Sequence, residues 1–391
     1  MSRRLLISAL PGETRAVWLR DGRLHDVSIQ RADRPAVAGN VYLGRVAALD
    51  RALEAAFVEI GLARPGFLPL SAAPKGLSEG QAVLVRAVRE PRADKGARLG
   101  ARGRDLPPGA AQAAAGLTPP ALVRAAADPI ATALADPHDL DEIRIDDPAT
   151  FARARAALVG HPALAARLAL DLDPAPLFER EGIEEDIEAL LAPRVALPSG
   201  GGLLVEPVET LTAIDVDSGR DTRRALAVDL EAAAEIRRQL RLRNLSGLIV
   251  VDFLGLADGA ARARVVDTLK RGVDADGRPA RVHAMRPSGL VEMTRQRVGP
   301  ALHELLSEPC GLGGGGRAKD PVTIAFEALR AVRADAARAP GRGPTIIAPP
   351  RVVDALQGPV LAAARRDVAA RLGYEPTLRA EPGRDGFEIV P

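Results

Sequence analysis

Short segments of alternating apolar and polar residues dominate the first hundred positions. Two such runs, 16–20 and 23–29, flank Asp21-Gly22, a pair that favours a tight hairpin because glycine adopts positive φ without strain. Further apolar segments follow at close spacing, separated by glycine and proline, over 41–46, 55–61, 66–70 and 81–88. Short strands spaced in this way predict a small β-barrel over residues 41–103.

The pattern changes after residue 103. Residues 104–120 are rich in proline, glycine and alanine, which is typical of a linker. Residues 121–192 are mainly helical in pattern, with one short strand over 141–146. Beyond Pro198–Gly202, strands and helices alternate. We expect strands over 203–206, 211–217, 247–253 and 280–285, and helices over 225–243 and 259–272.

A second glycine run, Gly311–Gly316, indicates a linker before the tail. The tail predicts a helix over 321–335, a strand over 344–348, a helix over 350–371 that breaks near Gly358-Pro359, and strands near 376 and 387. The whole chain is therefore expected to be an α/β (α+β) multidomain protein.

Composition narrows the class of protein. At about 150 residues per domain, 391 residues suggest two or three domains. With 53 basic and 51 acidic residues, the net charge of +2 does not mark the whole chain as a binder of polyanions, so such binding must rest on local patches. A single cysteine, Cys310, excludes an intramolecular disulfide. No apolar run approaches the roughly 18 residues of a membrane span. We expect a cytoplasmic protein without membrane association.

Three acidic residues stand at the ends of predicted strands. Asp215 and Asp217 would project to the same side of one strand, and Asp252 ends the apolar run that begins at Gly247. Converging carboxylates are what Mg²⁺ requires. An alternative explains each acid separately: Asp217 caps a turn, Asp215 pairs with an arginine and Asp252 caps a helix. Spacing alone favours this alternative.

Basic and aromatic residues offer a second candidate chemistry. Four arginines crowd the predicted helix within 231–244, and beside a metal site they would hold phosphates, although a solvated face with Glu–Arg pairs explains any single one better. In the predicted barrel, Phe57, Phe67 and Lys95 have the character of an oligonucleotide-binding surface. Two phenylalanines alone are more often part of a core.

Several separate motifs, in register from about residue 4 to the C-terminus, resemble the ribonuclease E/G family. The first group resembles the family's RNA-binding barrel: Asn40–Arg45, Ala55–Gly61, Gly66–Pro69 and Lys95–Leu99. The second resembles its catalytic core: Ile214–Gly219, Glu231–Asn244, Gly247–Phe253 and Gly289–Arg297.

The resemblance implies a domain order. An RNase H-like domain is interrupted by an OB-fold and followed by a DNase I-like catalytic domain and a small C-terminal α/β domain. The implied boundaries are 1–36 and 117–190 for the RNase H-like domain, 37–103 for the OB-fold, 104–116 for a short linker, 191–305 for the catalytic domain, 306–316 for a glycine linker and 317–391 for the C-terminal domain.

The resemblance also implies an activity. It is a Mg²⁺-dependent endoribonuclease (Mn²⁺ can substitute) that hydrolyses single-stranded RNA to 5′-phosphate and 3′-hydroxyl ends, in rRNA processing or mRNA decay. Asp215 and Asp252 would be catalytic and hold the metal, with Asp217 as a third candidate ligand. The implied RNA contacts are Phe57, Phe67, Lys95, Arg98, Arg241 and Arg243. The alternatives are an RNA-binding protein of the same fold with impaired catalysis, and a DNA nuclease.

The sequence departs from the family pattern at three places. Asp217 stands where the family usually has asparagine, so it either adds a ligand or overloads the site with negative charge. Residues 104–120 replace the 5′-sensor and contain no Arg-Thr pair, so we expect no reading of a 5′-monophosphate. Cys310 stands alone where the family carries Cys-Pro-x-Cys, and two thiolates across a homodimer fall short of four zinc ligands. We therefore expect no zinc and no zinc-linked assembly.

Overall fold

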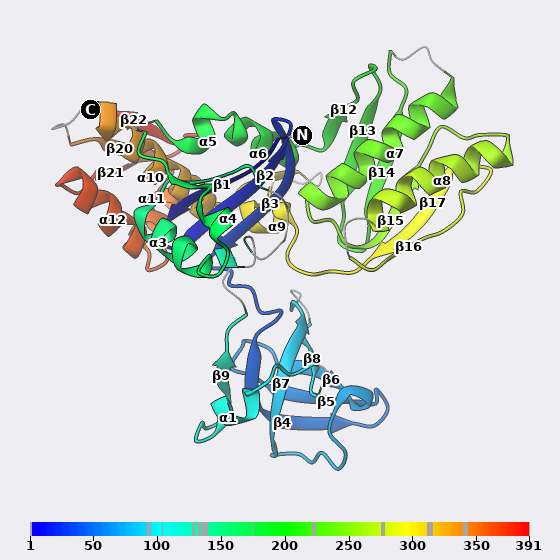
Figure 1. The fold of residues 1–391 in the computed structure, drawn as a ribbon, viewed down its shortest axis with the longest axis horizontal. Helices are drawn as coiled ribbons and strands as arrows, with labels where there is room; N and C mark the ends of the chain where they lie inside the picture. The colour runs from blue at the N-terminus through cyan, green and yellow to red at the C-terminus, as the bar shows by residue number, and fades with distance from the viewer. Residues whose placement is uncertain are drawn as a thin grey trace. The chain divides into compact units, whose positions relative to one another are not determined.

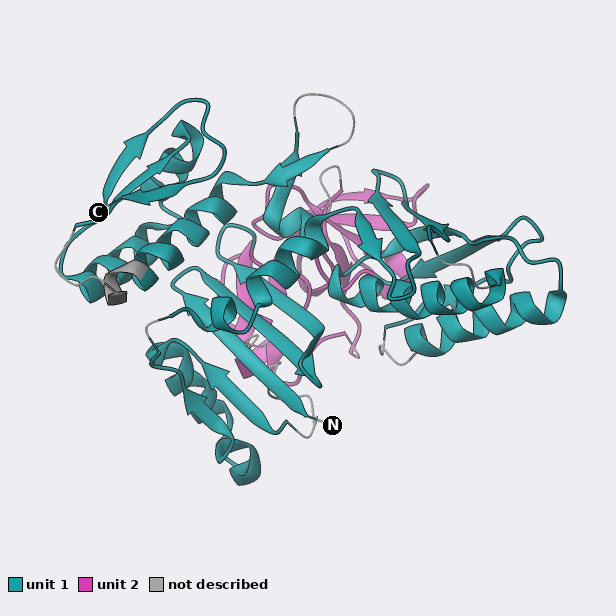
Figure 2. Cartoon of the chain, turned by 90° about the horizontal axis from the view of Figure 1, so that it is seen from above, with its two compact units in different colours: residues 1–34, 133–296, 301–391 teal, residues 35–132, 297–300 magenta. Residues whose placement is uncertain are grey.

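The computed structural model divides the chain into two compact units (Figure 2). Unit 1 comprises residues 1–34, 133–296 and 301–391, and unit 2 comprises residues 35–132 and 297–300. The structure describes residues 2–91, 95–103, 105–126, 130–131, 134, 140–173, 175–220, 224–274, 278–310, 316–338 and 343–390. Across these ranges, no helix has the length and apolar character needed to cross a membrane.

Unit 1 begins with a five-stranded sheet in the order β11-β10-β1-β2-β3. Asp21 and Gly22 both have positive φ and turn β2 into β3, which confirms the predicted hairpin. β10 and β11 pair in parallel with their neighbours. The strands are β1 (Arg3–Leu10), β2 (Glu13–Arg20), β3 (Arg23–Arg31), β10 (Glu142–Ile145) and β11 (Leu168–Leu170), accompanied by helices α3 (Pro148–Ala157), α4 (Pro162–Ala165), α5 (Leu177–Arg180) and α6 (Ile183–Leu191).

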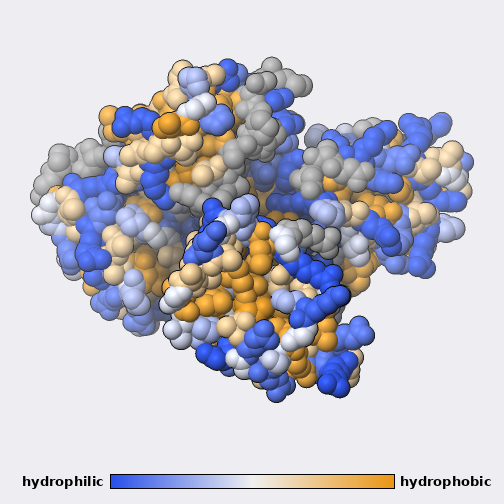
Figure 3. Space-filling view, turned by 60° about the horizontal axis from the view of Figure 1, so that its bottom comes forward, coloured by the Kyte–Doolittle hydropathy of each residue, from blue (hydrophilic) through white to orange (hydrophobic). Residues whose placement is uncertain are grey.

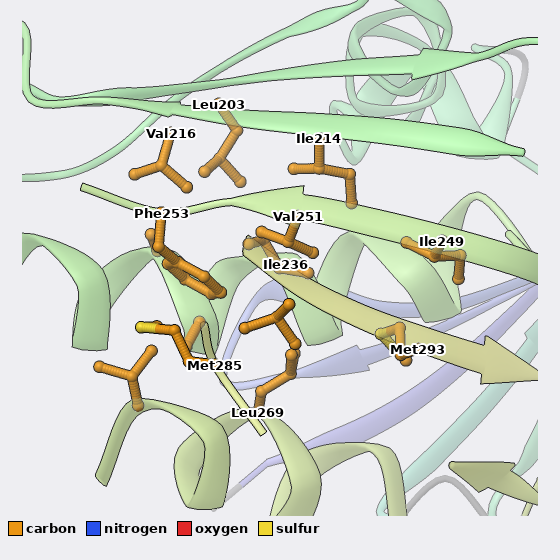
Figure 4. Packing of buried hydrophobic residues seen from close by; sticks show 14 of the residues in the cluster. Leu203, Ile214, Val216, Ile236, Ile249, Val251, Phe253, Leu269, Met285 and Met293 are labelled. Atoms are coloured by element: carbon orange, nitrogen blue, oxygen red, sulfur yellow. The ribbon is translucent and has the colours of Figure 1, made fainter. Parts of the chain in front are cut away.

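The second sheet of unit 1 has six strands in the order β12-β13-β14-β15-β17-β16. Helices α7 (Ala225–Leu242) and α8 (Gly259–Asp274) lie side by side against one face (Figure 1). Side chains such as Ile214, Val251 and Phe253 point from the sheet toward these helices (Figure 4). The strands are β12 (Arg194–Ala196), β13 (Gly202–Pro207), β14 (Thr212–Asp217), β15 (Gly247–Asp252), β16 (Ala280–Val282) and β17 (Leu290–Arg295).

The C-terminal part of unit 1 contains a three-stranded sheet in the order β21-β20-β22. The predicted long helix is two helices, α11 (Pro350–Gln357) and α12 (Ala362–Leu372), because Pro359 lacks the backbone N–H that a continuous helix needs. Most of the predicted linker, 311–315, lies outside the described residues. The other elements are α9 (Leu302–Leu306), β18 (Ser307–Pro309), β19 (Arg317–Lys319), α10 (Pro321–Arg338), β20 (Thr345–Ala348), β21 (Thr377–Ala380) and β22 (Glu388–Val390).

Unit 2 is a closed barrel, as the strand pattern predicts. The ring β4-β5-β6-β8-β7 closes because β4 pairs with both β5 and β7, an arrangement consistent with an OB-like fold. β9 adds to β4 from beyond the expected barrel end at residue 103, so the chain stays with the barrel as far as Arg124. The elements are β4 (Val41–Asp50), β5 (Ala55–Glu59), β6 (Gly66–Pro69), the 3₁₀ turn η1 (Leu70–Ala72), β7 (Ala82–Arg89), β8 (Arg98–Gly100), α1 (Ala110–Ala114) and β9 (Ala121–Arg124).

The surface of the barrel mixes apolar and hydrophilic side chains on the face turned to the viewer in Figure 3. Several large apolar residues of this unit stay exposed, namely Leu53, Leu62, Leu70, Leu117 and Leu122. Small proteins cannot cover all of their surface with polar groups, so scattered leucines of this kind need no special explanation.

Arg31, at the end of β3, is a fully buried cation that joins the first sheet to the C-terminal part of unit 1. Its guanidinium donates to both carboxylate oxygens of Asp33 (2.9 and 2.8 Å), to the carbonyl of Leu305 (2.7 Å) and to the hydroxyl of Thr323 (2.7 Å). It also pairs with Asp320 at 3.2 Å. A buried charge is tolerated only when it is paired and hydrogen-bonded, and Arg31 meets both conditions.

Arg31→Ala should lower the free energy of unfolding by about 3–5 kcal/mol, because it leaves buried carboxylates without their cation. Chemical denaturation followed by circular dichroism measures this loss. The matched control is Arg23→Ala, which removes an exposed arginine from the same strand and should change stability little. Equal unfolding midpoints for the two variants would contradict the role assigned to Arg31.

Candidate functional site

The three acids identified from the sequence lie on one face of the second sheet. Along β14 and β15, Ile214, Val216 and Val251 are buried toward the helices, whereas Asp215, Asp217 and Asp252 are exposed. β14 and β15 run parallel, and Asp215 is the direct pairing partner of Asp252. Paired residues of adjacent strands project to the same side, so these two carboxylates are neighbours at the carboxyl ends of their strands.

The hydrogen bonding of the acids separates Asp217 from the other two. Its Oδ1 accepts the backbone N–H of Gly219 at 2.8 Å, which is the turn-capping role that the alternative interpretation gives it. Asp252 does not cap the next helix, because Asp258 accepts the N–H groups of Ala260 and Ala261 there. Within the described part of the chain, the carboxylates of Asp215 and Asp252 have no hydrogen-bond or ion-pair partner.

Two neighbouring carboxylates without a counter-charge are suited to a hard cation. Mg²⁺ is commonly held by one or two carboxylates, with water and phosphate oxygens completing its octahedron. The donor set of Asp215 and Asp252 fits that requirement. No group of three or more His, Cys, Asp or Glu side chains suitable for a metal is found among the described residues, and metal binding by Asp217 stays a prediction.

The arginines of α7 contact protein. Arg238 donates to the carbonyl of Leu24 (3.3 Å), and Arg241 donates to the carbonyl of His25 (2.8 Å), so both fasten the helix to β3. Arg243 is 4% exposed and donates to the carbonyl of Ala192 at 2.7 Å. Burial lowers the pKa of Arg243 to about 10. RNA contact by Arg241 and Arg243 stays a prediction.

A row of outward-facing residues crosses the barrel. Phe57 of β5 pairs with Phe67 of β6, Phe67 pairs with Arg98 of β8, and Arg98 pairs with Arg89 of β7. The two phenyl rings are 6.1 Å apart between centroids and meet edge to face at 76°. Both phenylalanines are partly exposed and alternate with buried residues, so they lie outside the barrel core. We call Phe57, Phe67, Arg98 and Arg89 the barrel row.

Two like charges end the barrel row. Arg89 and Arg98 are exposed, stand opposite each other on adjacent strands, and have no ion-pair partner in the described residues. Like charges in this position destabilise a sheet, and an anion between them would relieve the repulsion. Arg89 was not predicted from the sequence. Strict alternation would put Arg89 on the same side as the buried Val85 and Ala87, but a bulge between Ala87 and Arg89 leaves it exposed opposite Arg98.

Lys95 is exposed just before β8, next to a position where only glycine fits. A Cβ on Gly96 would lie 1.8 Å from the carbonyl oxygen of Pro65, so the two backbones approach too closely for any side chain. This contact holds the Lys95 segment against the strand that carries Phe67.

Sequence comparison relates the chain to known proteins. A sequence model of the ribonuclease E/G family matches residues 109–298. Ribonuclease E of Escherichia coli strain K12 is 30% identical over 85% of this chain and 40% of its own length. Ribonuclease G of Salmonella typhimurium strain SL1344 is 27% identical over the full length of both chains, and ribonuclease G of Escherichia coli strain K12 is 26% identical over the same extent.

The chain belongs to the ribonuclease E/G family. It spans less than half the length of the ribonuclease E relatives, from 40% to 48%, but all of the ribonuclease G sequences. It is therefore a member of the short, ribonuclease G-like form.

One buried acid of this family member lies directly behind the candidate site. Asp229 of α7 is 0% exposed, and its Oδ1 accepts the backbone N–H of Leu254 at 3.0 Å. Its Oδ2 is buried and has no hydrogen-bond partner in the described residues. Burial disfavours the charged form and raises the pKa of Asp229 from 3.8 to about 6.

Asp229→Asn should stabilise the protein at neutral pH. Because the pKa of Asp229 is raised in the folded state, its contribution favours folding below about pH 4 and is lost as the pH rises through about 6. A difference of about 2 pKa units corresponds to about 3 kcal/mol, so the variant should gain up to about 3 kcal/mol near pH 7.5 and about half of that near pH 5.

Urea denaturation of both proteins at these two pH values tests this expectation. Asp267→Asn, which changes an exposed acid on α8, serves as the control and should show no such pH dependence. A stability difference that is the same at both pH values would contradict a raised pKa for Asp229.

Proposed function

We propose that this protein is a Mg²⁺-dependent endoribonuclease that hydrolyses single-stranded RNA to 5′-phosphate and 3′-hydroxyl ends. The observation that carries the proposal is the pairing of Asp215 with Asp252, which sets two unpartnered carboxylates side by side. The relatives named ribonuclease E and ribonuclease G support the choice of RNA as substrate. Its pathway in this proposal is rRNA processing or mRNA decay.

In this mechanism the chain supplies position and charge. Asp215 and Asp252 would hold a Mg²⁺ ion, and a bound ion would supply an acidified water and offset charge on the phosphate oxygens. The water oxygen would bond to phosphorus and give up its proton to solvent, while the bond from phosphorus to the 3′ oxygen breaks and the 3′ oxygen takes up a proton. Asp217, whose Oδ1 already serves the turn at Gly219, keeps its Oδ2 for orienting a water.

The barrel row would hold the RNA strand. Phe57 and Phe67 offer rings on which bases stack, and stacking accepts any base because each has a π-face. Arg98, Arg89 and Lys95 would neutralise phosphates. Such binding suits a single strand, whose bases are free to turn toward the protein.

The finer architecture belongs to the same proposal. The sheet of β1–β3, β10 and β11 would be the RNase H-like domain, the barrel an OB-fold, and the sheet of β12–β17 the DNase I-like catalytic domain. The small sheet of β20–β22 would be the C-terminal domain. Because Cys310 is the single cysteine, we propose that any homodimer of this cytoplasmic enzyme assembles without a shared zinc ion.

Asp252→Asn should reduce cleavage of a labelled single-stranded RNA by at least about 100-fold, comparable to the loss of one transition-state contact. Gel analysis with Mg²⁺ or with EDTA measures the rate, and the exposed Asp267→Asn serves as the control. A DNA strand of the same sequence distinguishes the two nuclease classes. RNA binding without cleavage by the wild-type protein would instead support an RNA-binding protein with impaired catalysis.

Removing single members of the barrel row should weaken RNA binding in two distinct ways. Phe67→Ala should lower affinity by about 5- to 150-fold, since stacking contributes about 1–3 kcal/mol per base. Arg89→Ala should reduce the slope of log affinity against log salt by about 0.7, the loss of one phosphate contact on a single strand. Fluorescence anisotropy in EDTA measures both.

The control for these variants is Arg45→Ala, an exposed arginine of the same barrel whose pairing partner is the acidic Glu59. Its removal should leave the salt slope unchanged. A salt slope for Arg89→Ala equal to that of wild type would remove Arg89 from the RNA-binding surface.

A further inference from the structure

Asp229 is a buried acid that the stability of the fold does not require. Asp229 is fully buried on α7, whose residues Val228 and Ala232 belong to the apolar core of the second sheet. It has no ion-pair partner, and one of its oxygens has no hydrogen-bond partner in the described residues. Burying such a group is unfavourable, and an apolar side chain of the same size would stabilise the core better. A buried polar atom left unsatisfied in this way calls for a functional explanation.

The hydrogen bond that the Asp229 carboxylate accepts suggests what this residue does. Leu254, whose N–H it accepts, is the second residue after Asp252. The segment from 253 to 258 leaves the sheet immediately after the proposed metal ligand. The path of this segment fixes the backbone dihedrals at Asp252 and thereby the direction of its carboxylate.

Other contacts hold residues 253–258 to the β17 side, to the apolar core and to α8. The N–H of Phe253 donates to the carbonyl of Gly289 on the β17 side at 3.3 Å. The Phe253 side chain packs near Val216 and Met285 in the core (Figure 4). The carbonyls of Leu256 and Ala257 accept from Arg262 of α8. The hydrogen bond from Leu254 to Asp229 is the one contact in this set that ties the segment to α7.

The hydrogen bond from Leu254 to Asp229 matters because α7 lies between the two strands that carry the proposed ligands. The helix is the crossover between β14, which carries Asp215, and β15, which carries Asp252. Asp229 therefore connects the element that follows one proposed ligand to the loop that follows the other. This hydrogen bond is a link between the two ligand-bearing segments in addition to the pairing of β14 with β15.

We propose that Asp229 is a positioning residue that sets the metal affinity of the Asp215–Asp252 pair by holding the backbone at Leu254. This inference rests on the proposed function, since it assumes that the pair binds a divalent cation. What the residue must supply is a hydrogen-bond acceptor at Oδ1. Asparagine offers the same acceptor, whereas leucine fills the same space without one.

Mn²⁺ binding in the absence of RNA, followed by electron paramagnetic resonance of the free ion, tests the proposal directly. Asp229→Leu should weaken Mn²⁺ binding by about tenfold, equivalent to about 1.4 kcal/mol, and should raise the Mg²⁺ concentration for half-maximal cleavage by the same factor. Asp229→Asn should stay within about threefold of the wild-type value. The matched control is Asp258→Ala, which removes the cap of α8 at the other end of the same loop and should leave Mn²⁺ affinity unchanged.

A cooperative urea transition followed by circular dichroism shows whether each variant is folded, because Asp229 lies in unit 1 and RNA binding by the barrel of unit 2 would not report on it. Wild-type Mn²⁺ affinity in a folded Asp229→Leu variant would overturn the positioning role and leave the proposed nuclease intact. Equal weakening by leucine and asparagine would also overturn it, because the acceptor would then not be what matters. Absence of Mn²⁺ binding by the wild-type protein would overturn the metal site and this inference together.

Discussion

The parallel pairing of β14 with β15 is the constraint on which the candidate site depends. Two parallel neighbours cannot be joined by a tight turn, so the chain must cross over the sheet, and α7 makes that crossing. The crossover covers one face of the sheet and leaves the other open. Because the strands run in the same direction, each brings an acidic residue near its carboxyl end, Asp215 or Asp252, to the same edge. Antiparallel strands would have placed those residues at opposite ends.

Charge compensation differs sharply between parts of the molecule. Arg31 and Arg15 are buried, and each is matched by carboxylates at hydrogen-bonding distance. Asp215 and Asp252 on the sheet, and Arg89 and Arg98 on the barrel, are adjacent like charges with no such partner in the described residues. The charges of Arg31 and Arg15 are thus neutralised within the fold, whereas those of the two exposed pairs are not neutralised by any described residue. The uncompensated pairs are therefore the places where an external ion or phosphate would bind most favourably.

The alternation of apolar and polar residues is sufficient to predict the strands and helices whose own sequence has a clear pattern. The hairpin at Asp21-Gly22, the closed barrel and the alternation of β13 to α8 follow from alternating patterns and glycine positions. The short strands β11 and β12, three residues each, were not predicted, because their strand character comes from neighbours distant in sequence. No strand is predicted over Gly289–Arg297, which contains β17. Its pairing with β15 depends on the tertiary fold and not on its local sequence.

The site was predictable to a similar degree. Strand alternation was enough to put Asp215 and Asp217 on one face, but it could not show that Asp217 serves its own turn. Helical spacing in α7 suggested a basic surface, whereas Arg241 and Arg243 contact protein, because partners in β3 and at Ala192 lie far away in sequence. Asp229 had no sequence signal at all. An acid in a helix of mixed polarity is unremarkable until its surroundings are known to be apolar.

The insertion of the barrel between β3 and β10 has a consequence for biosynthesis. β1 pairs with β10 across 138 residues, so at about 5–20 residues per second the ribosome needs roughly 7–30 s to deliver the partner of β1. During that interval the barrel, whose strand pairings all fall within one continuous stretch, can fold without waiting for later residues. β1, with Leu5, Leu6 and Ile7 fully buried in the finished protein, has one open edge throughout. β1 is thus exposed to aggregation during this interval, long before the six-stranded sheet of β12–β17 has been made.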